Sequence, residues 1–250
     1  MFEPSGASWG QVPLPPGFIQ TVRDMTTKRG VVMLMDEVIT GFRWSSGGAQ
    51  KAYGVTPDLC ILAKIVAGGL PGGAVAGKRE ILDLIDHAST AAKKLERIGH
   101  PGTYNANPLS AAAAVTALSL LRDEDLAEKA NRTAAVLRKA LTQVLVDEGI
   151  PWGIYGQSST FLIYPNPTGD DIDPATFDPL KQGFAKLKGG RSGPLSGKIR
   201  MGLMTHGVDV MGAPGGFVSA THGAAEIEKT VHALRQTVRA LKAEREVKAA

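Results

Sequence analysis

Asp36 and Lys64 each stand directly after a run of apolar residues. The run before Asp36 covers residues 31–35, and the run before Lys64 covers residues 59–63. Short continuous apolar runs are typical of strands that are buried on both faces of a parallel sheet. Because the carboxyl ends of such strands face the same crevice, we expect the carboxylate and the amine to approach the same space and to be partly buried there.

An acid and an amine in one crevice suit a particular cofactor chemistry. Pyridoxal phosphate needs a lysine amine that holds its aldehyde as an imine, and a carboxylate that keeps its pyridine nitrogen protonated. Asp36 and Lys64 are the residue types for these two roles. Taken singly, Lys64 is read at least as well as a solvated lysine at a strand end, and Asp36 as a helix or turn cap.

The segments around these two residues favour the cofactor interpretation. Together they resemble the class III aminotransferases of fold type I, and their sequences are most similar to those of the glutamate-1-semialdehyde aminomutases and their aminotransferase relatives. The segments occur in the following order: MDEVITGFR at 35–43, GVTPDL at 54–59, AKIVAGGLP at 63–71 and GTYNANP at 102–108.

The resemblance implies a fold, a reaction and a role for each of four residues. The fold is α/β: part of the large domain of fold type I, mainly a parallel sheet with helices, followed by a small C-terminal α+β domain. Asp36 would pair with the pyridine nitrogen, Val38 would pack against one face of the ring, and Lys64 would be both the Schiff-base anchor and the proton carrier. Thr103 would reach the cofactor phosphate, usually that of the neighbouring subunit, which implies a homodimer with shared active sites.

The reaction that the resemblance implies is transamination. An amino group would pass from an amine or amino acid donor to a keto or aldehyde acceptor through the Lys64 imine, and an internal transfer of the aminomutase type would use the same machinery.

One departure from the family concerns length. Members of the family have roughly 170 to 200 further residues before the position of Glu3, about a domain's worth of chain. The missing part normally supplies a phosphate-binding turn and much of the substrate pocket. We therefore keep three readings open: a truncated product, one half of a split enzyme with a separate N-terminal half, or a reduced transaminase that dimerisation completes. A non-catalytic fragment that binds partners is the alternative of a different class.

Helical spacing and capping residues predict the elements around these motifs. We expect helices over 16–29, ending at Gly30, and from Pro108 to Leu121 with Asn107 as the cap. A long helix before Gly149 would link a cofactor-binding region (1–149) to the small domain (150–250). Within the small domain the pattern predicts a last helix with apolar positions from 227 to 241, and short strands over 160–164, 199–203 and 216–220.

Composition excludes several classes of protein. A hydrophobic content of 43% supports a sizeable core, and a net charge of +4 that is scattered along the chain gives no nucleic-acid footprint. No apolar segment approaches the roughly 20 residues that span a bilayer, and no signal peptide is visible at the start. The single cysteine, Cys60, lies in an apolar run and suits a reducing, cytoplasmic location.

A few other patterns have weaker readings. Residues 72–78 match the first seven positions of a phosphate-binding P-loop, but Arg79 replaces the Ser or Thr that would hold magnesium. His100, His206 and His222 are too dispersed for a metal site, so no metal is expected. Arg43 could meet a substrate carboxylate, although a salt-bridged arginine in a turn is at least as good a reading.

Overall fold

The computed structural model describes residues 1–189 and 193–247, and its internal contacts divide the chain into two compact units. Unit 1 comprises Met1–Pro4 and Pro15–Asp125, and unit 2 comprises Ser5–Leu14 and Leu126–Ala250. The long helix that begins at Leu126 belongs with unit 2 because its apolar stripe is buried there. The functional division at 149/150 remains a prediction.

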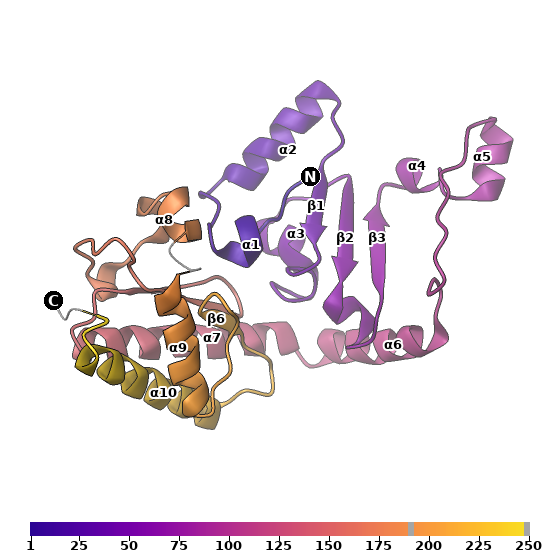
Figure 1. The fold of residues 1–250 in the computed structure, drawn as a ribbon. Coiled ribbons are helices and arrows are strands. Elements are labelled where there is room, and N and C mark those ends of the chain that lie inside the picture. The colour runs from indigo at the N-terminus through magenta and orange to yellow at the C-terminus, as the bar shows by residue number, and fades with distance from the viewer. Residues whose placement is uncertain (190–192, 248–250) are drawn as a thin grey trace. The chain divides into compact units, whose positions relative to one another are not determined.

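Unit 1 contains a three-stranded sheet in the order β1-β2-β3. Strands β1 (Leu34–Glu37) and β2 (Leu59–Ala63) are parallel, and β3 (Gly73–Gly77) is antiparallel to β2 (Figure 1). The outer edge of β1 is bridged by Phe2, whose N–H donates to the Leu34 carbonyl over 3.2 Å. The outer edge of β3 has no strand partner among the described residues.

Helices of unit 1 connect and flank these strands. α2 connects the Phe2 segment to β1, α3 connects β1 to β2, and α6 closes the unit after a long loop (Figure 1). Their bounds are α2 Phe18–Arg29, α3 Gly48–Tyr53, η1 Lys64–Ala67, α4 Arg79–Leu82, α5 His87–Lys93 and α6 Pro108–Asp123.

Two predicted helices of unit 1 are confirmed together with the residues that end or begin them. α2 ends at Gly30, which has a left-handed φ of 62°. α6 begins after Asn107, whose Oδ1 accepts hydrogen bonds from the N–H groups of Leu109 (3.0 Å) and Ser110 (3.2 Å). Local capping chemistry therefore decides both boundaries.

The predicted strand over 31–35 is wrong in its bounds. The strand begins only at Leu34, and Val31 and Val32 are each 53% exposed. The N–H of Val31 still bonds back to Thr26 at the end of α2, over 2.9 Å. The first apolar residues thus complete a helix terminus, and only the second half of the run enters the sheet.

Unit 2 is an α+β unit with a three-stranded antiparallel sheet in the order β4-β5-β6. Its described elements are α1 Ala7–Gly10, α7 Leu126–Asp147, β4 Gly153–Tyr155, β5 Thr160–Tyr164, η2 Pro174–Thr176, η3 Pro179–Lys181, α8 Phe184–Gly189, α9 Pro194–Thr205, β6 Gly215–Phe217 and α10 Ala224–Ala243.

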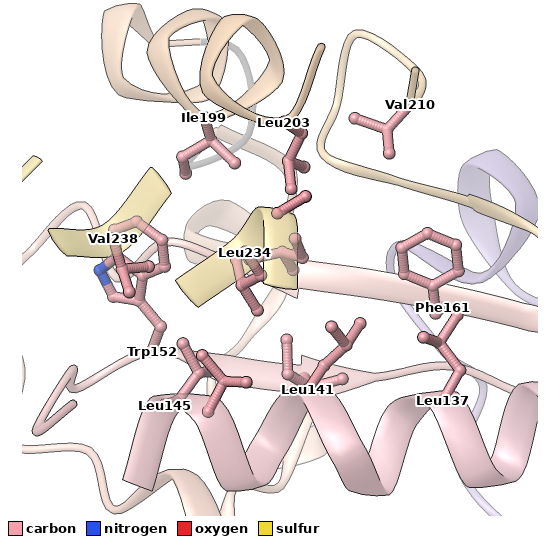
Figure 2. Packing of buried hydrophobic residues seen from close by; sticks show 14 of the residues in the cluster. Leu137, Leu141, Leu145, Trp152, Phe161, Ile199, Leu203, Val210, Leu234 and Val238 are labelled. Atoms are coloured by element: carbon pink, nitrogen blue, oxygen red, sulfur yellow. The ribbon is translucent and has the colours of Figure 1, made fainter. Parts of the chain in front are cut away.

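The core of unit 2 lies between α7, α9, α10 and the sheet (Figure 2). Leu137, Leu141 and Leu145 form the stripe of α7 that the sequence predicts, and each is at most 5% exposed. Leu234 and Val238 of α10 are fully buried in the same cluster, as the apolar spacing of the last helix indicates.

One predicted strand of unit 2 is wrong and another is shorter than expected. Residues 199–203 lie in α9 and not in a strand, because Ile199 and Leu203, four positions apart, bury one helical face while Met201 is 66% exposed. The strand predicted over 216–220 ends at Phe217 as β6, whereas β5 has the predicted bounds.

Candidate active site

Asp36 lies at the carboxyl end of β1 and is half-buried. Its side chain lies on the face of the strand opposite Met35 and Glu37, both of which are fully buried. One carboxylate oxygen, Oδ1, accepts the backbone N–H of Val38 over 3.1 Å. The other oxygen, Oδ2, has no hydrogen-bond partner among the described residues, so the carboxylate is oriented on one side and available on the other.

Lys64 follows β2 directly and is the first residue of the short helix η1. Its φ of 58° is left-handed, a conformation that costs a non-glycine residue about 1 kcal/mol or more. The side chain is exposed, and its ammonium has no ion-pair or hydrogen-bond partner in the described part of the chain. The expected partial burial of Lys64 is therefore not found.

The strand register brings the two residues to one edge of the sheet. Asp36 pairs with Ile61 and Glu37 with Leu62, so Lys64 lies just beyond the point where β1 ends. Because β1 and β2 are parallel, their carboxyl ends share that edge, as the sequence predicts.

The turn that carries Lys64 is fastened to α6. Gly68 has a φ of 61°, and a Cβ atom there would lie 2.4 Å from the Ala113 carbonyl oxygen, so only glycine fits this approach. Ser110 of α6 donates its hydroxyl to the Pro71 carbonyl over 2.7 Å. The backbone after Lys64 is consequently held against α6 at two points.

Val38 and Thr103 occupy different settings. Val38 is half-buried in the turn after β1. Thr103 is exposed, in the loop that precedes α6. A cavity of about 670 Å³ lies between that loop, α6 and the turn after Lys64, and its lining includes His100, Tyr104 and Ala67 but not Thr103. The roles predicted for Val38 and Thr103 remain predictions.

Glu37 is a residue whose importance the sequence did not reveal. It is fully buried, and its carboxylate accepts four hydrogen bonds from neighbouring donors. The donors are the Thr40 hydroxyl (2.9 Å), the Ala49 N–H (2.7 Å), the Gln50 N–H (3.2 Å) and the Gln50 side-chain amide (3.1 Å). The alternation of a strand would have placed Glu37 opposite Asp36, and this was the available signal.

Asp58 is a second buried carboxylate, just before β2. It accepts hydrogen bonds from the Met33 N–H (2.7 Å), from Arg23 (3.0 Å) and from Lys78 (2.8 Å). Burial on its own would raise the pKa of Asp58, but these three donors outweigh it and lower the pKa to about 2. Asp58 therefore joins α2, β1 and the end of β3.

Lys78 was the lysine of the P-loop-like segment. Its partner is Asp58, and Gly73–Gly77 form the strand β3 and not a loop around a phosphate. The P-loop reading is therefore wrong.

A larger cavity of about 980 Å³ lies on the other face of the same sheet. Its lining includes Glu37, Cys60 and Leu62 but neither Asp36 nor Lys64. Burial raises the pKa of the Cys60 thiol, which argues against a reactive thiolate there. Burial also lowers the pKa of Arg43, whose Nε donates to the Ile39 carbonyl over 3.0 Å.

Comparison with known proteins places the chain in a family. The family model described as Aminotransferase class-III matches residues 1–151. The chain belongs to the class III aminotransferases. A glutamate-1-semialdehyde 2,1-aminomutase from Methanosarcina acetivorans is 34% identical over 93% of this chain, and one from Prosthecochloris aestuarii is 43% identical over 56% of it.

Solved structures of a transaminase and of an aminomutase share the fold. An omega-transaminase from Sphaerobacter thermophilus matches 95% of this chain at 30% identity with a TM-score of 0.76. A glutamate-1-semialdehyde aminomutase from Pseudomonas aeruginosa matches 92% of it at 20% identity with a TM-score of 0.73, a likeness of fold alone. The expected fold, a part of fold type I, is thereby confirmed. The chain spans 51% of the Methanosarcina relative and 50% of the Sphaerobacter transaminase.

Among the described helices, none has both the length and the apolar character needed to cross a bilayer.

Proposed function

We propose that this chain is part of a pyridoxal-phosphate-dependent aminotransferase that moves an amino group from an amine or amino acid donor to a carbonyl acceptor. The observation that carries the proposal is the shared edge of β1 and β2, where Asp36 and Lys64 end adjacent parallel strands in a class III aminotransferase. An internal transfer of the aminomutase type is the second candidate, because the curated relatives cited above bear that name.

The residues at this edge fit the cofactor. Asp36 offers one oxygen that no described residue uses, and Lys64 offers an amine without a partner. An available carboxylate and a free amine match a ligand that presents a basic ring nitrogen and an aldehyde. When bound, pyridoxal phosphate supplies the electron sink that lets a proton leave the carbon bearing the amino group.

Each residue has a distinct task in the proposed reaction. Asp36 holds a proton on the ring nitrogen by charge, and the Val38 N–H keeps its carboxylate oriented. Val38 would limit one face of the ring by contact. The Nζ atom of Lys64 would hold the cofactor and would carry a proton to and from the substrate carbon. Thr103 would donate a hydrogen bond from its hydroxyl to a phosphate oxygen of the cofactor that is bound in the partner subunit.

The proposal is tested by locating the lysine that captures the cofactor. The purified chain is mixed with pyridoxal phosphate, reduced with borohydride, freed of excess reagent and mapped by peptide mass spectrometry. We expect the adduct at Lys64 and its loss in Lys64→Ala, while Lys51→Ala, which changes an exposed lysine on α3, leaves the adduct in place. An adduct spread evenly over exposed lysines, unchanged by Lys64→Ala, would refute a dedicated site.

The two reactions are separated by the choice of substrate. A transaminase produces a new amine only when both an amino donor and a carbonyl acceptor are present. An aminomutase converts glutamate-1-semialdehyde without an added donor. Product analysis with and without a donor distinguishes them, and no product with any substrate despite an adduct at Lys64 would favour the non-catalytic fragment.

The proposal also includes two partners of the chain. One is a second copy, in a homodimer with shared active sites, and the other is a segment equivalent to the other half of the relatives. Exposed apolar residues support a covering segment: Val31 and Val32 are 53% exposed, Val75 is 46% exposed, and β3 is an uncharged edge strand. Sedimentation equilibrium tests the dimer, and a monomer at all concentrations would contradict it. A cytoplasmic location belongs to the same proposal and is favoured by the single, free cysteine Cys60.

A further inference from the structure

The strand β1 ends on two adjacent carboxylates with opposite surroundings. Asp36 is half-buried and uses one oxygen in a bond to Val38, whereas Glu37 is fully buried and uses both oxygens. The proposed function assigns a task to Asp36 only. A buried carboxylate costs folding free energy unless its surroundings satisfy it, so the position of Glu37 requires an explanation.

The partners of Glu37 are uncharged and come from two segments. Ala49 and Gln50, at the start of α3, donate to Oε2 and Oε1 respectively. The Thr40 hydroxyl, in the turn after β1, donates to Oε2 as well. No cation pairs with Glu37 among the described residues, so its charge is held by hydrogen bonds alone. The carboxylate therefore joins the turn to α3.

Close backbone packing fixes the same turn. The Gly41 N–H donates to the Glu37 carbonyl over 2.9 Å, and a Cβ atom at Gly41 would lie 2.7 Å from that oxygen. At Gly48, where φ is 71°, a Cβ atom would lie 2.4 Å from Oε2 of Glu37. Side chains are thus excluded at Gly41 and Gly48, and this close packing restrains the turn over 38–41.

Val38 connects this turn to the candidate active site. Its N–H is the donor that orients the Asp36 carboxylate, and it lies one residue after Glu37 and two before Thr40. We propose that Glu37 is a positioning residue: by holding Thr40, it fixes the Val38 N–H and thereby the direction in which Asp36 faces the cofactor. This inference rests on the proposed function for the identity of the cofactor.

The bond between Glu37 and Thr40 offers a selective test. Thr40→Val removes the hydroxyl at nearly constant shape and leaves the bonds from Glu37 to α3 intact, and Thr40→Ser restores the hydroxyl. If Glu37 only anchors α3, neither variant changes the surroundings of Asp36. Circular dichroism and thermal unfolding establish that both variants are folded, and Thr116→Val, an exposed threonine on α6, is the matched control.

Two measurements are made on the wild-type chain and the variants. The first is hydrogen exchange of the Val38 amide without cofactor, which we expect to be about tenfold faster in Thr40→Val, in line with the loss of one hydrogen bond to a charged group. The second is the pH titration of the visible absorbance of the lysine-bound cofactor, together with its dissociation constant, which we expect to rise about tenfold. Thr40→Ser should return both quantities to wild-type values.

The outcomes separate this inference from the proposed function. If the wild-type chain binds no cofactor at Lys64, the proposed function fails for the isolated chain, and Val38 exchange alone decides whether Glu37 fixes the turn. Unchanged exchange in Thr40→Val overturns the inference. Faster exchange with an unchanged absorbance titration also overturns it, because the turn would then not control Asp36.

Discussion

Neutralising Asp58 should destabilise unit 1 in a pH-dependent manner. The side chain of Asp58 is 6% exposed and accepts hydrogen bonds from Met33, Arg23 and Lys78. In Asp58→Asn the amide group turns a donor toward at least one of these donors, and the negative charge that pairs with two cations is lost. A buried donor left without an acceptor is costly, so we expect the free energy of unfolding of the variant to be lower than that of the wild type at neutral pH.

The size of the effect follows from the lowered pKa of Asp58. The pKa of Asp58 falls from its ordinary value of 3.8 to about 2 in the folded chain. At about 1.4 kcal/mol per unit this corresponds to at most about 2.5 kcal/mol. Because Lys78 is 54% exposed, solvent screens its charge and reduces the expected contribution to about 1 to 2 kcal/mol.

The sign of the pH dependence is fixed by the same shift. Because the pKa of Asp58 is lower in the folded chain than in the unfolded chain, its contribution is fully present above about pH 4 and is lost as the pH falls toward 2. The difference in unfolding free energy between the wild type and Asp58→Asn should therefore shrink over this range. The reason is that the carboxylate of the unfolded wild-type chain takes up a proton at a higher pH than that of the folded chain.

Urea unfolding of both proteins between pH 7 and pH 2.5 measures this difference, with hydrogen exchange of unit 1 amides to localise it. Asp123→Asn is the control, because Asp123 is 56% exposed and its ion pair is with its sequence neighbour Arg122. A free-energy difference between the wild type and Asp58→Asn that is constant across the whole pH range would refute the linkage.

Two further predictions concern packing. Gly68→Ala should destabilise unit 1 by about 1 to 3 kcal/mol more than Gly69→Ala, because both glycines have positive φ but only Gly68 would bring a Cβ against Ala113. Urea unfolding of the two variants measures this difference. Equal losses would mean that backbone strain alone accounts for the cost. Leu141→Ala should lower the free energy of unfolding of unit 2 by about 2 to 5 kcal/mol, since Leu141 is 1% exposed in the core. Val136→Ala, on the exposed face of the same helix, should lower it little. Similar losses in both variants would contradict the packing in Figure 2.

Local signals made several elements predictable from the sequence. Gly30 and Asn107 marked helix boundaries because each satisfies backbone groups at a helix end. The run before Lys64 gave β2 with correct bounds, and the parallel pairing of β1 and β2 brought Asp36 and Lys64 to one edge as expected. These features depend on residues close in sequence, or on a general rule of parallel sheets.

Other features depend on tertiary context that the sequence pattern does not contain. β3 consists of glycine, alanine and one valine, so it has weak strand propensity and resembled a phosphate-binding loop. In α9 an alternating sequence concealed two apolar residues four positions apart. The pattern does not single out Glu37 because the adjacent Asp36 already has a chemical role, and the exposure of Lys64 depends on which segments pack around the end of β2.

The opposite orientations of Asp36 and Glu37 constrain how this segment can change in evolution. Side chains alternate along a strand, so inserting or deleting one residue within β1 would exchange the two faces. Glu37 would then point toward the candidate active site, and Asp36 would be too short to reach Ala49 and Gln50 at the start of α3. Substitutions can alter either position separately, but a change of length by one residue would disable both at once, and we expect the spacing within β1 to be more constant among relatives than its apolar residues.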